Sequence, residues 1–158
     1  AEDLGVMTPE GIMLLKDSKL PGMKVLEFSF DPGEPGTQEL HTFTKHSICY
    51  TGTHDNTPVM AWRDECDEET VTYCSRYLGL HDEEGFNWGM IRAGMGSVCN
   101  LFIAQMQDYL GLGAESRINT PGVVYGNWRW RAKKEAFTYE LAKKIDEMTI
   151  MYGRREFL

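Results

Sequence analysis

Two short acidic motifs hold the side chains with which this sequence could do chemistry. Glu2 lies in AEDLG, at the first residues of the chain, and Asp55 lies in THDN, directly after an apolar stretch. Two carboxyl groups that meet across a site can act on a glycosidic bond. One of them, protonated, donates to the leaving oxygen, and the other, ionised, meets an oxocarbenium-like charge. Glycosidic bond chemistry is therefore the first hypothesis for this pair.

Each motif also has a purely structural interpretation. Acidic residues near a helix N-terminus are favoured by the helix dipole, and an aspartate in a loop commonly forms a hydrogen-bonded turn. Their shared placement favours the chemical interpretation, because each lies just before an expected helix or just after an expected strand. That position is the C-terminal edge of a parallel sheet, where barrel enzymes keep their catalytic groups. We therefore expect Glu2 and Asp55 to belong to one site.

Sugar chemistry also predicts aromatic side chains as platforms for the substrate. The chain has four tryptophans: Trp62, Trp88, Trp128 and Trp130. For any single tryptophan, packing in the core is the commoner role. Trp128 and Trp130 stand in the polar string GNWRWR, so these two are the hardest to bury together.

The composition is that of one ordinary globular domain. Of 158 residues, 42% are hydrophobic and 25% are charged, which suits a chain with a single core. A net charge of −8 and a pI near 5.0 argue against a nucleic-acid partner, which would need a basic face. No stretch approaches the roughly 18 apolar residues of a membrane span, and the N-terminus lacks signal-peptide features. We expect a cytoplasmic protein without a membrane segment.

The cysteines and histidines are not spaced as metal ligands. The cysteines contain no C-x-x-C pair and are expected to be free thiols: Cys49, Cys66, Cys74 and Cys99. The histidines show no H-E-x-x-H motif or other zinc spacing: His41, His46, His54 and His81. We predict no metal site.

The first half of the chain predicts a helix and two strands. Thr8 as N-cap and Pro9 at the first turn indicate a helix over about 9–18. Residues 23–30, MKVLEFSF, show the alternation of a strand, and 31–46 form a long loop rich in proline and glycine. Residues 47–52, SICYTG, are nearly continuous in apolar character, which indicates a strand buried on both faces.

The second half predicts three helices and one more strand. Helical spacing after Asp67 ends at Gly79, and a helix rich in small residues covers 87–100. Residues 101–106 are a third buried strand, followed by a loop over 107–122. The last helix is amphipathic, with one apolar stripe: Phe137, Leu141, Ile145, Met148 and Tyr152. This alternation of elements predicts an α/β fold with a parallel sheet.

Five motifs, in this order, resemble a known family: AEDLG, PGMKVLEFSF, YTGTHDN, QDYLGLGAESRINTPG and GNWRWR. They look like the C-terminal third of the amylomaltases, the 4-α-glucanotransferases of glycoside hydrolase family 77. The resemblance covers nearly the whole chain. It implies that residues 1–158 are the C-terminal fragment of a catalytic (β/α)8 TIM barrel, with about three of its strands and the surrounding helices.

The same resemblance implies a function. The family transfers α-1,4-glucan segments between maltooligosaccharides through a covalent glycosyl-enzyme, with retention and without a metal or organic cofactor. Glu2 resembles the general acid/base and Asp55 the carboxylate that stabilises the transition state, while His54 resembles a ligand of sugar hydroxyls. Further candidates for lining the glucan groove are Asp3, Phe28, Asn119 and Asn127.

The nucleophile of the family is missing from this sequence. It is an aspartate on an earlier strand, and because the chain also opens on Ala1 rather than methionine, we expect it to lie upstream. The isolated chain should then be catalytically silent. Its expected partners are the α-1,4-glucan substrate and either the missing N-terminal part or copies of itself, because three strands of a barrel leave open edges.

Two other functions remain open at this point. The chain could be a non-catalytic carbohydrate-binding or assembly module that uses its tryptophans. It could also belong to an α-amylase-type hydrolase, which shares the barrel and the carboxylates. The motifs LGLGAESRINTPG and GNWRWR favour the transferase.

Overall fold

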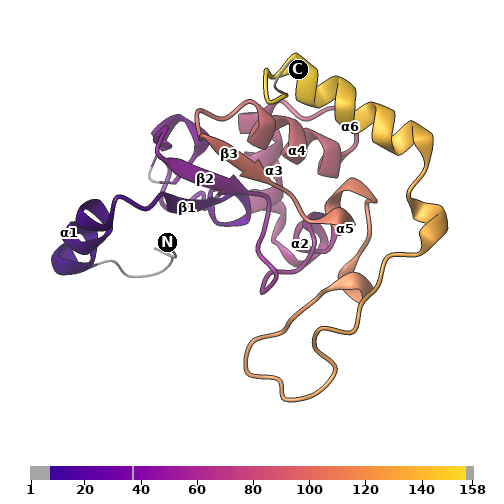
Figure 1. The fold of residues 1–158 in the computed structure, drawn as a ribbon, viewed down its shortest axis with the longest axis horizontal. Helices are drawn as coiled ribbons and strands as arrows, with labels where there is room; N and C mark the ends of the chain where they lie inside the picture. The colour runs from indigo at the N-terminus through magenta and orange to yellow at the C-terminus, as the bar shows by residue number, and fades with distance from the viewer. Residues whose placement is uncertain (1–7, 37, 156–158) are drawn as a thin grey trace.

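A three-stranded parallel sheet forms the centre of the molecule (Figure 1). The computed structural model describes residues 8–36 and 38–155. The strands are neighbours in chain order, β1-β2-β3, and both pairings are parallel. Their bounds are β1 Gly22–Val25, β2 Ser47–Tyr50 and β3 Leu101–Ile103. The helices are α1 Pro9–Ser18, α2 Val59–Glu65, α3 Glu68–Leu78, α4 Phe86–Met95, α5 Met106–Tyr109 and α6 Tyr139–Met151.

Local capping sets the ends of three helices. The Thr8 hydroxyl accepts a hydrogen bond from the backbone N–H of Gly11 at the start of α1, as the sequence predicted. Asp67 caps α3 in the same way, and Gly79 ends that helix with a φ of 60°, which costs glycine little. Thr138 caps α6. The α/β fold with a parallel sheet that the sequence predicted is confirmed.

Helix α4 is the centre of the packing. All but two of its ten residues are buried, and it contacts α2, α3, α5, α6 and β3. One side, through Met90, joins the core cluster that includes Leu26, Phe30 and Cys49. The other side carries Trp88, Ile91 and Met95, against which the stripe of α6 packs: Leu141, Ile145, Met148 and Tyr152. The predicted stripe is confirmed for these four, whereas Phe137 lies before α6 and is exposed.

The first strand is shorter than predicted. β1 ends at Val25, and residues Leu26–Phe28 form a 3-10 helix. The Ser29 hydroxyl donates to the carbonyl of Val25, and the Ser29 backbone N–H donates to the carbonyl of Leu26. These bonds close a turn where the alternation of residue types had indicated a continuing strand. The chain therefore turns although its alternating residues favour a strand, because the turn places both Leu26 and Phe30 in the core.

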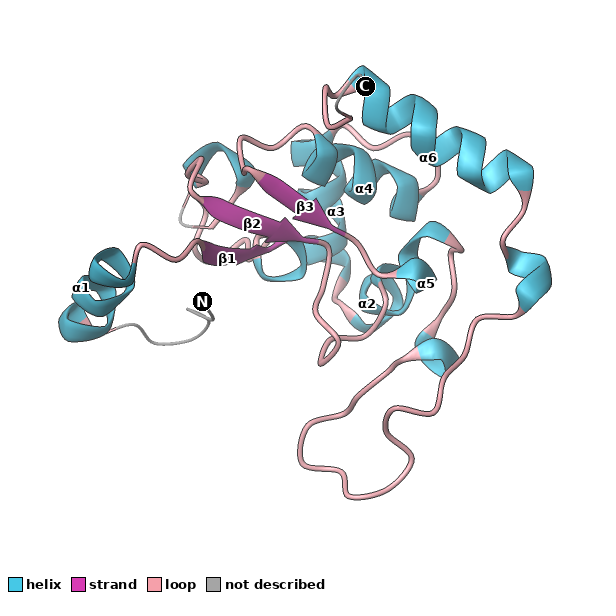
Figure 2. Cartoon of the chain, viewed as in Figure 1, coloured by secondary structure: helices cyan, strands magenta, loops and turns pink. Residues whose placement is uncertain are grey.

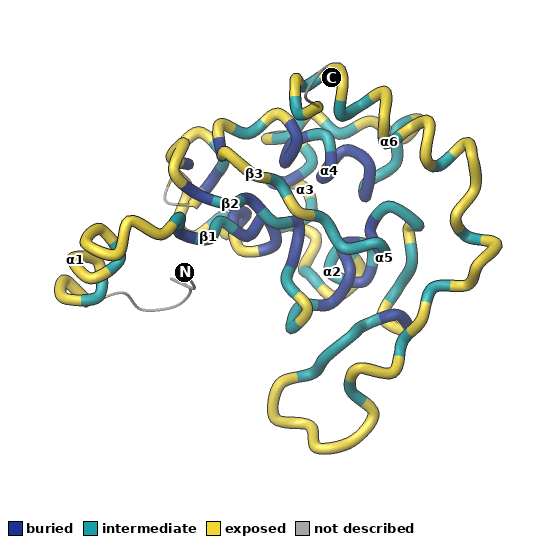
Figure 3. Tube along the Cα trace, in the orientation of Figure 1, coloured by how far each residue is buried: buried dark blue, intermediate teal, exposed yellow. Residues whose placement is uncertain are grey.

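The third strand is not buried, contrary to the prediction. β3 spans Leu101–Ile103, and the side chains of Leu101 and Ile103 are 48% and 41% exposed. They lie on the sheet face opposite Cys49 and Phe102, which pack against the helices. Figure 3 shows β3 largely in the colour of exposed residues. The apolar residues of β3 predicted a buried strand. Among the described residues, however, the helices cover only the face that carries Phe102.

The helix predicted over 87–100 ends five residues early, at Met95. The Arg154 guanidinium donates to the carbonyls of Met95, Ser97 and Cys99, so a side chain from the C-terminal end takes the acceptors that a longer helix would have used. Helix α2 was not predicted, and α5 interrupts the loop predicted over 107–122. The remainder of that loop runs on to α6 around the lower right of Figure 2.

Gly94 allows α4 to approach β3 closely. A Cβ atom at this position would lie 2.0 Å from Cε2 of Phe102. We expect Gly94→Ala to lower the free energy of unfolding by about 1–3 kcal/mol, because the methyl group overpacks the core. Gly96→Ala is the matched control, since its Cβ would lie 3.2 Å from Cε1 of Tyr152, a contact that can relax. The measurement is the urea midpoint of both variants at one protein concentration. Equal midpoints would show that this contact does not limit packing.

Candidate active site

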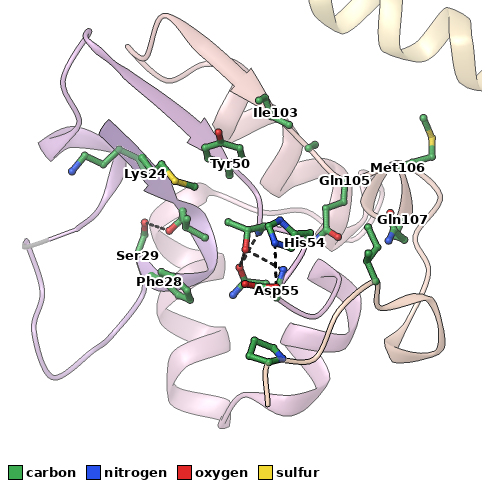
Figure 4. Close-up of a pocket in the computed structure, with 18 of the residues that line it drawn as sticks. Lys24, Phe28, Ser29, Tyr50, His54, Asp55, Ile103, Gln105, Met106 and Gln107 are labelled. Atoms are coloured by element: carbon green, nitrogen blue, oxygen red, sulfur yellow. Dashed lines mark hydrogen bonds and ion pairs between the residues drawn. The ribbon is translucent and has the colours of Figure 1, made fainter. Parts of the chain in front are cut away.

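A large pocket lies at the carboxyl ends of the three strands (Figure 4). Its volume is about 1390 Å³. Each strand contributes a wall, with Lys24 from β1, Tyr50 from β2 and Ile103 from β3. The segment that follows β2, Gly52 to Asn56, also lines it. Parallel strands bring the segments that follow them to one edge, which is why residues distant in sequence meet here.

Asp55 faces this pocket from the turn after β2. Its Oδ1 accepts a hydrogen bond of 2.6 Å from Nδ2 of Asn119 and lies 3.2 Å from Nε2 of His54. Among residues 8–36 and 38–155, Oδ2 has no hydrogen-bond partner. The side chain is 45% exposed. One carboxylate oxygen is therefore held while the other is available to a ligand.

The segment after the 3-10 helix Ala114–Ser116 anchors the turn that carries Asp55. The Arg117 Nη2 donates to the carbonyl of Asp55 at 2.6 Å, and its Nε donates to the carbonyl of Asn119 at 2.9 Å. The backbone N–H of Asn119 donates to the carbonyl of His54. Arg117 and Asn119 were not predicted to do this. Arg117 lies inside a motif quoted for the resemblance, but nothing in its local spacing points to Asp55.

The turn also closes on itself. Asn56 Oδ1 accepts from the backbone N–H of Thr53 at 2.9 Å and from the Thr53 hydroxyl at 2.7 Å. The backbone N–H of Asp55 donates to that same hydroxyl at 3.2 Å. Side-chain hydrogen bonds of this kind are the usual use of threonine and asparagine in turns. THDN therefore forms a hydrogen-bonded turn, as the structural interpretation expected, and this turn faces the pocket. The chemical role of Asp55 stays a prediction.

The His54 ring packs against Trp128, with ring centroids 5.1 Å apart. Trp128 has a φ of 63°, the left-handed region that non-glycine residues rarely adopt. Its backbone N–H donates to the carbonyl of Ile118 at 2.7 Å. Such backbone strain concentrates at functional sites. Trp130 also lines the pocket, whereas Trp62 and Trp88 pack in the core, so the pair in GNWRWR is the one at the site.

The remaining sequence candidates lie in different places. Phe28 lines the pocket and is partly exposed. The Asn127 amide group forms hydrogen bonds with the backbone of Thr120 and Val123, so it closes the exposed loop that leads into the GNWRWR motif. Glu2 and Asp3 lie outside the described residues.

Two buried carboxyl groups lie behind the turn. Burial raises the pKa of Glu27 to about 9, with Asp108 adding to the rise and Arg117 opposing it. Burial also raises the pKa of Asp108, although that carboxyl group accepts hydrogen bonds from the Thr51 hydroxyl and the Val59 backbone. Sequence reasoning missed Glu27, although a charged residue inside an apolar stretch was a visible signal.

All four cysteines are free thiols. In the described part of the chain, no group of three or more His, Cys, Asp or Glu side chains could hold a metal ion. No helix of those same residues is long and apolar enough to cross a membrane.

Comparison with known proteins decides the family. Residues 1–137 match the model of glycoside hydrolase family 77, described as 4-alpha-glucanotransferase. The chain belongs to this family. A 4-alpha-glucanotransferase from Clostridium butyricum is 44% identical over 157 residues, which are 99% of this chain and 32% of that protein. The chloroplastic/amyloplastic 4-alpha-glucanotransferase of Solanum tuberosum is 38% identical, over 98% of this chain and 27% of its own length.

A solved structure of the family agrees with the fold. The amylomaltase from Streptococcus agalactiae in complex with acarbose superposes with a TM-score of 0.95 and 33% identity, over 99% of this chain and 32% of that one. The amylomaltase from Corynebacterium glutamicum, at 16% identity and a TM-score of 0.60, shows the fold alone. The predicted membership of glycoside hydrolase family 77 is confirmed. The chain has the α/β fold of part of a (β/α)8 barrel and spans about a third of the length of these relatives.

Proposed function

We propose that the chain is the C-terminal part of a cytoplasmic 4-α-glucanotransferase, which transfers α-1,4-glucan segments between maltooligosaccharides with retention. The observation that carries this is the placement of Asp55. In a member of glycoside hydrolase family 77, this carboxylate lies at the carboxyl edge of the parallel strands, with one oxygen held by Asn119 and one available.

The described residues support a division of roles. Asp55 stabilises the positive charge that develops on the sugar in the transition state. His54, held between Asp55 and Trp128, binds sugar hydroxyl groups. Phe28 and Trp130 line the glucan groove. Asn119 orients Asp55, and Asn127 shapes the loop beside the groove.

Two further groups complete the scheme. Glu2 acts as general acid/base, and an aspartate upstream of the chain acts as the nucleophile. Glu2 protonates the leaving oxygen and then deprotonates the 4-hydroxyl of the acceptor sugar as the covalent intermediate breaks down. The substrate is an α-1,4-glucan, and no step uses a metal or organic cofactor.

The test is the action of the full-length enzyme on maltotriose. A transferase produces glucose together with oligosaccharides longer than maltotriose, whereas a hydrolase produces only shorter ones. A carbohydrate-binding module leaves maltotriose unchanged although it binds glucan. Longer products support the proposal, and either of the other two results overturns it.

The isolated chain should not be a monomer. In the described part of the chain, β1 and β3 are the edges of the sheet, and exposed apolar residues lie on β3 and α1: Leu101, Ile103, Met13 and Leu14. None of the residues of α1 is buried, and the helix projects from the body (Figure 1). We expect self-association, or docking with the N-terminal part, that buries on the order of 1,000 Å².

Light scattering on the dilute chain measures this association. Leu14→Lys should weaken it, whereas Val124→Lys, at an exposed apolar position of the loop over 120–127 and outside α1 and the strands, should not. Adding the upstream part of the protein should replace self-association by a one-to-one complex. A compact, cooperatively unfolding monomer of 18.0 kDa would contradict the prediction.

A further inference from the structure

Glu27 lies directly beneath the turn that carries the site. It belongs to the 3-10 helix after β1, and its backbone N–H donates to the carbonyl of Thr51 at 3.1 Å. Its carboxyl group lies against Gly52: a Cβ atom at Gly52 would be 2.7 Å from Oε1 and 3.0 Å from Oε2 of Glu27. Gly52 begins the segment that continues through His54 to Asp55. A movement of the Glu27 side chain would therefore shift the backbone of that segment.

The surroundings of Glu27 suit a neutral carboxyl group. The residue is only 6% exposed, and within residues 8–36 and 38–155 its Oε1 has no hydrogen-bond partner. A buried carboxylate without partners is costly. The charged groups close enough to act on it are the acidic Asp108 on α5 and Glu65 on α2 and the cationic Arg117.

Cys66 and the hydrogen bonds of Arg117 complete the surroundings of Glu27. The Cys66 thiol at the end of α2 also lies within its electrostatic reach. Arg117 already donates to the carbonyls of Asp55 and Asn119. The guanidinium thus holds the backbone of the site and also acts electrostatically on Glu27.

We propose that Glu27 is a positioning residue: its protonated carboxyl group supports Gly52 and the turn that carries His54 and Asp55, and its ionisation disrupts the site. When Glu27 loses its proton, the new charge attracts the Arg117 guanidinium and draws it from the Asp55 carbonyl. The turn then loses its anchor. The link between this disruption and catalysis rests on the proposed function, but the movement of the turn does not.

The first experiment compares the pH profiles of kcat/KM for the full-length enzyme and Glu27→Gln. Glutamine has the same shape and remains uncharged. We expect activity within about threefold of the parent at neutral pH and an alkaline decline that moves up by at least about one pH unit, because the titrating group is gone. Glu83→Gln, at an exposed position, is the matched control and should leave the profile unchanged. An unmoved decline in Glu27→Gln, or loss of activity at neutral pH with the fold intact, overturns the proposal.

The second experiment needs no activity. Because the His54 ring lies 5.1 Å from the Trp128 ring, movement of the turn changes the ring-current shift of the His54 ring protons in NMR spectra. We expect a step in that shift near pH 9 in the parent, well above the ordinary titration of histidine, and none in Glu27→Gln. Absence of the step in the parent overturns the proposal, whether or not the variant folds. If the step is present but maltotriose is not transformed, the proposed function fails and the positioning role stands.

The third experiment follows stability against pH. The pKa of Glu27 is about 9 in the folded protein and 4.5 ordinarily, so above pH 4.5 the unfolded chain releases a proton that the folded chain keeps. Stability is therefore lost progressively from pH 4.5 up to about 9. The Tm of Glu27→Gln relative to the parent should rise by several degrees between about pH 5 and pH 9. A constant difference would show that Glu27 ionises normally and would overturn the proposal.

Discussion

In the full-length enzyme, Asp55→Asn is expected to lower kcat for maltotriose disproportionation by on the order of 10³-fold, because a preorganised charge opposite the transition state is removed. The amide keeps the size of the carboxylate, and its oxygen can still accept the hydrogen bond from Asn119. The turn around Thr53 and Asn56 does not use the Asp55 side chain, so folding should be preserved. The loss therefore reports charge rather than shape.

Steady-state kinetics with maltotriose measure this loss, and circular dichroism checks the fold. Asp82→Asn is the matched control, since Asp82 is exposed and away from the pocket, and its kcat should equal that of the parent. The role assigned to Asp55 would be wrong if Asp55→Asn kept a tenth of parental activity.

Glu2→Gln should lower transfer from maltotriose by about 10²–10⁴-fold, because an amide cannot protonate the leaving oxygen. The size of this loss should depend on the leaving group. A maltosyl fluoride donor needs little protonation, and an azide acceptor needs no base, so transfer from the fluoride to azide should recover most of the parental rate. Asp55→Asn should show no such recovery. The positive charge that Asp55 stabilises develops on the sugar whichever group leaves.

The two variants therefore test separate roles with one pair of substrates. Product analysis of the maltotriose and the fluoride–azide reactions measures both. Equal losses of Glu2→Gln in the two reactions would remove the acid/base assignment. Recovery of Asp55→Asn with the fluoride donor would instead assign proton transfer to Asp55.

Much of the fold follows from local patterns. Thr8 begins α1 and Gly79 ends α3 as their neighbours in the sequence indicated, because capping is decided within one turn of chain. The stripe of α6 was readable for the same reason, since residues three and four apart share a face. The family could be identified from five ordered motifs, and with it the class of the sheet.

The lengths of the strands and the burial of their side chains were harder to predict from the sequence. The alternation in MKVLEFSF continues beyond Val25, yet the chain turns there, because Leu26 and Phe30 reach a core formed with α4. Leu101 and Ile103 have the apolar character of buried residues, but burial depends on what covers a strand, and the described residues leave these two 48% and 41% exposed.

The sequence by itself determined the family, the helical caps and the candidates Asp55, His54 and Trp128, because motifs and caps are read from neighbours along the chain. Only the tertiary structure decided that Arg117 and Asn119 hold Asp55, that Trp128 packs on His54, and that Glu27 lies under Gly52. These contacts join strands and loops separated by many residues. No local spacing records them, because they arise when parallel strands bring the segments that follow them to one edge of the sheet.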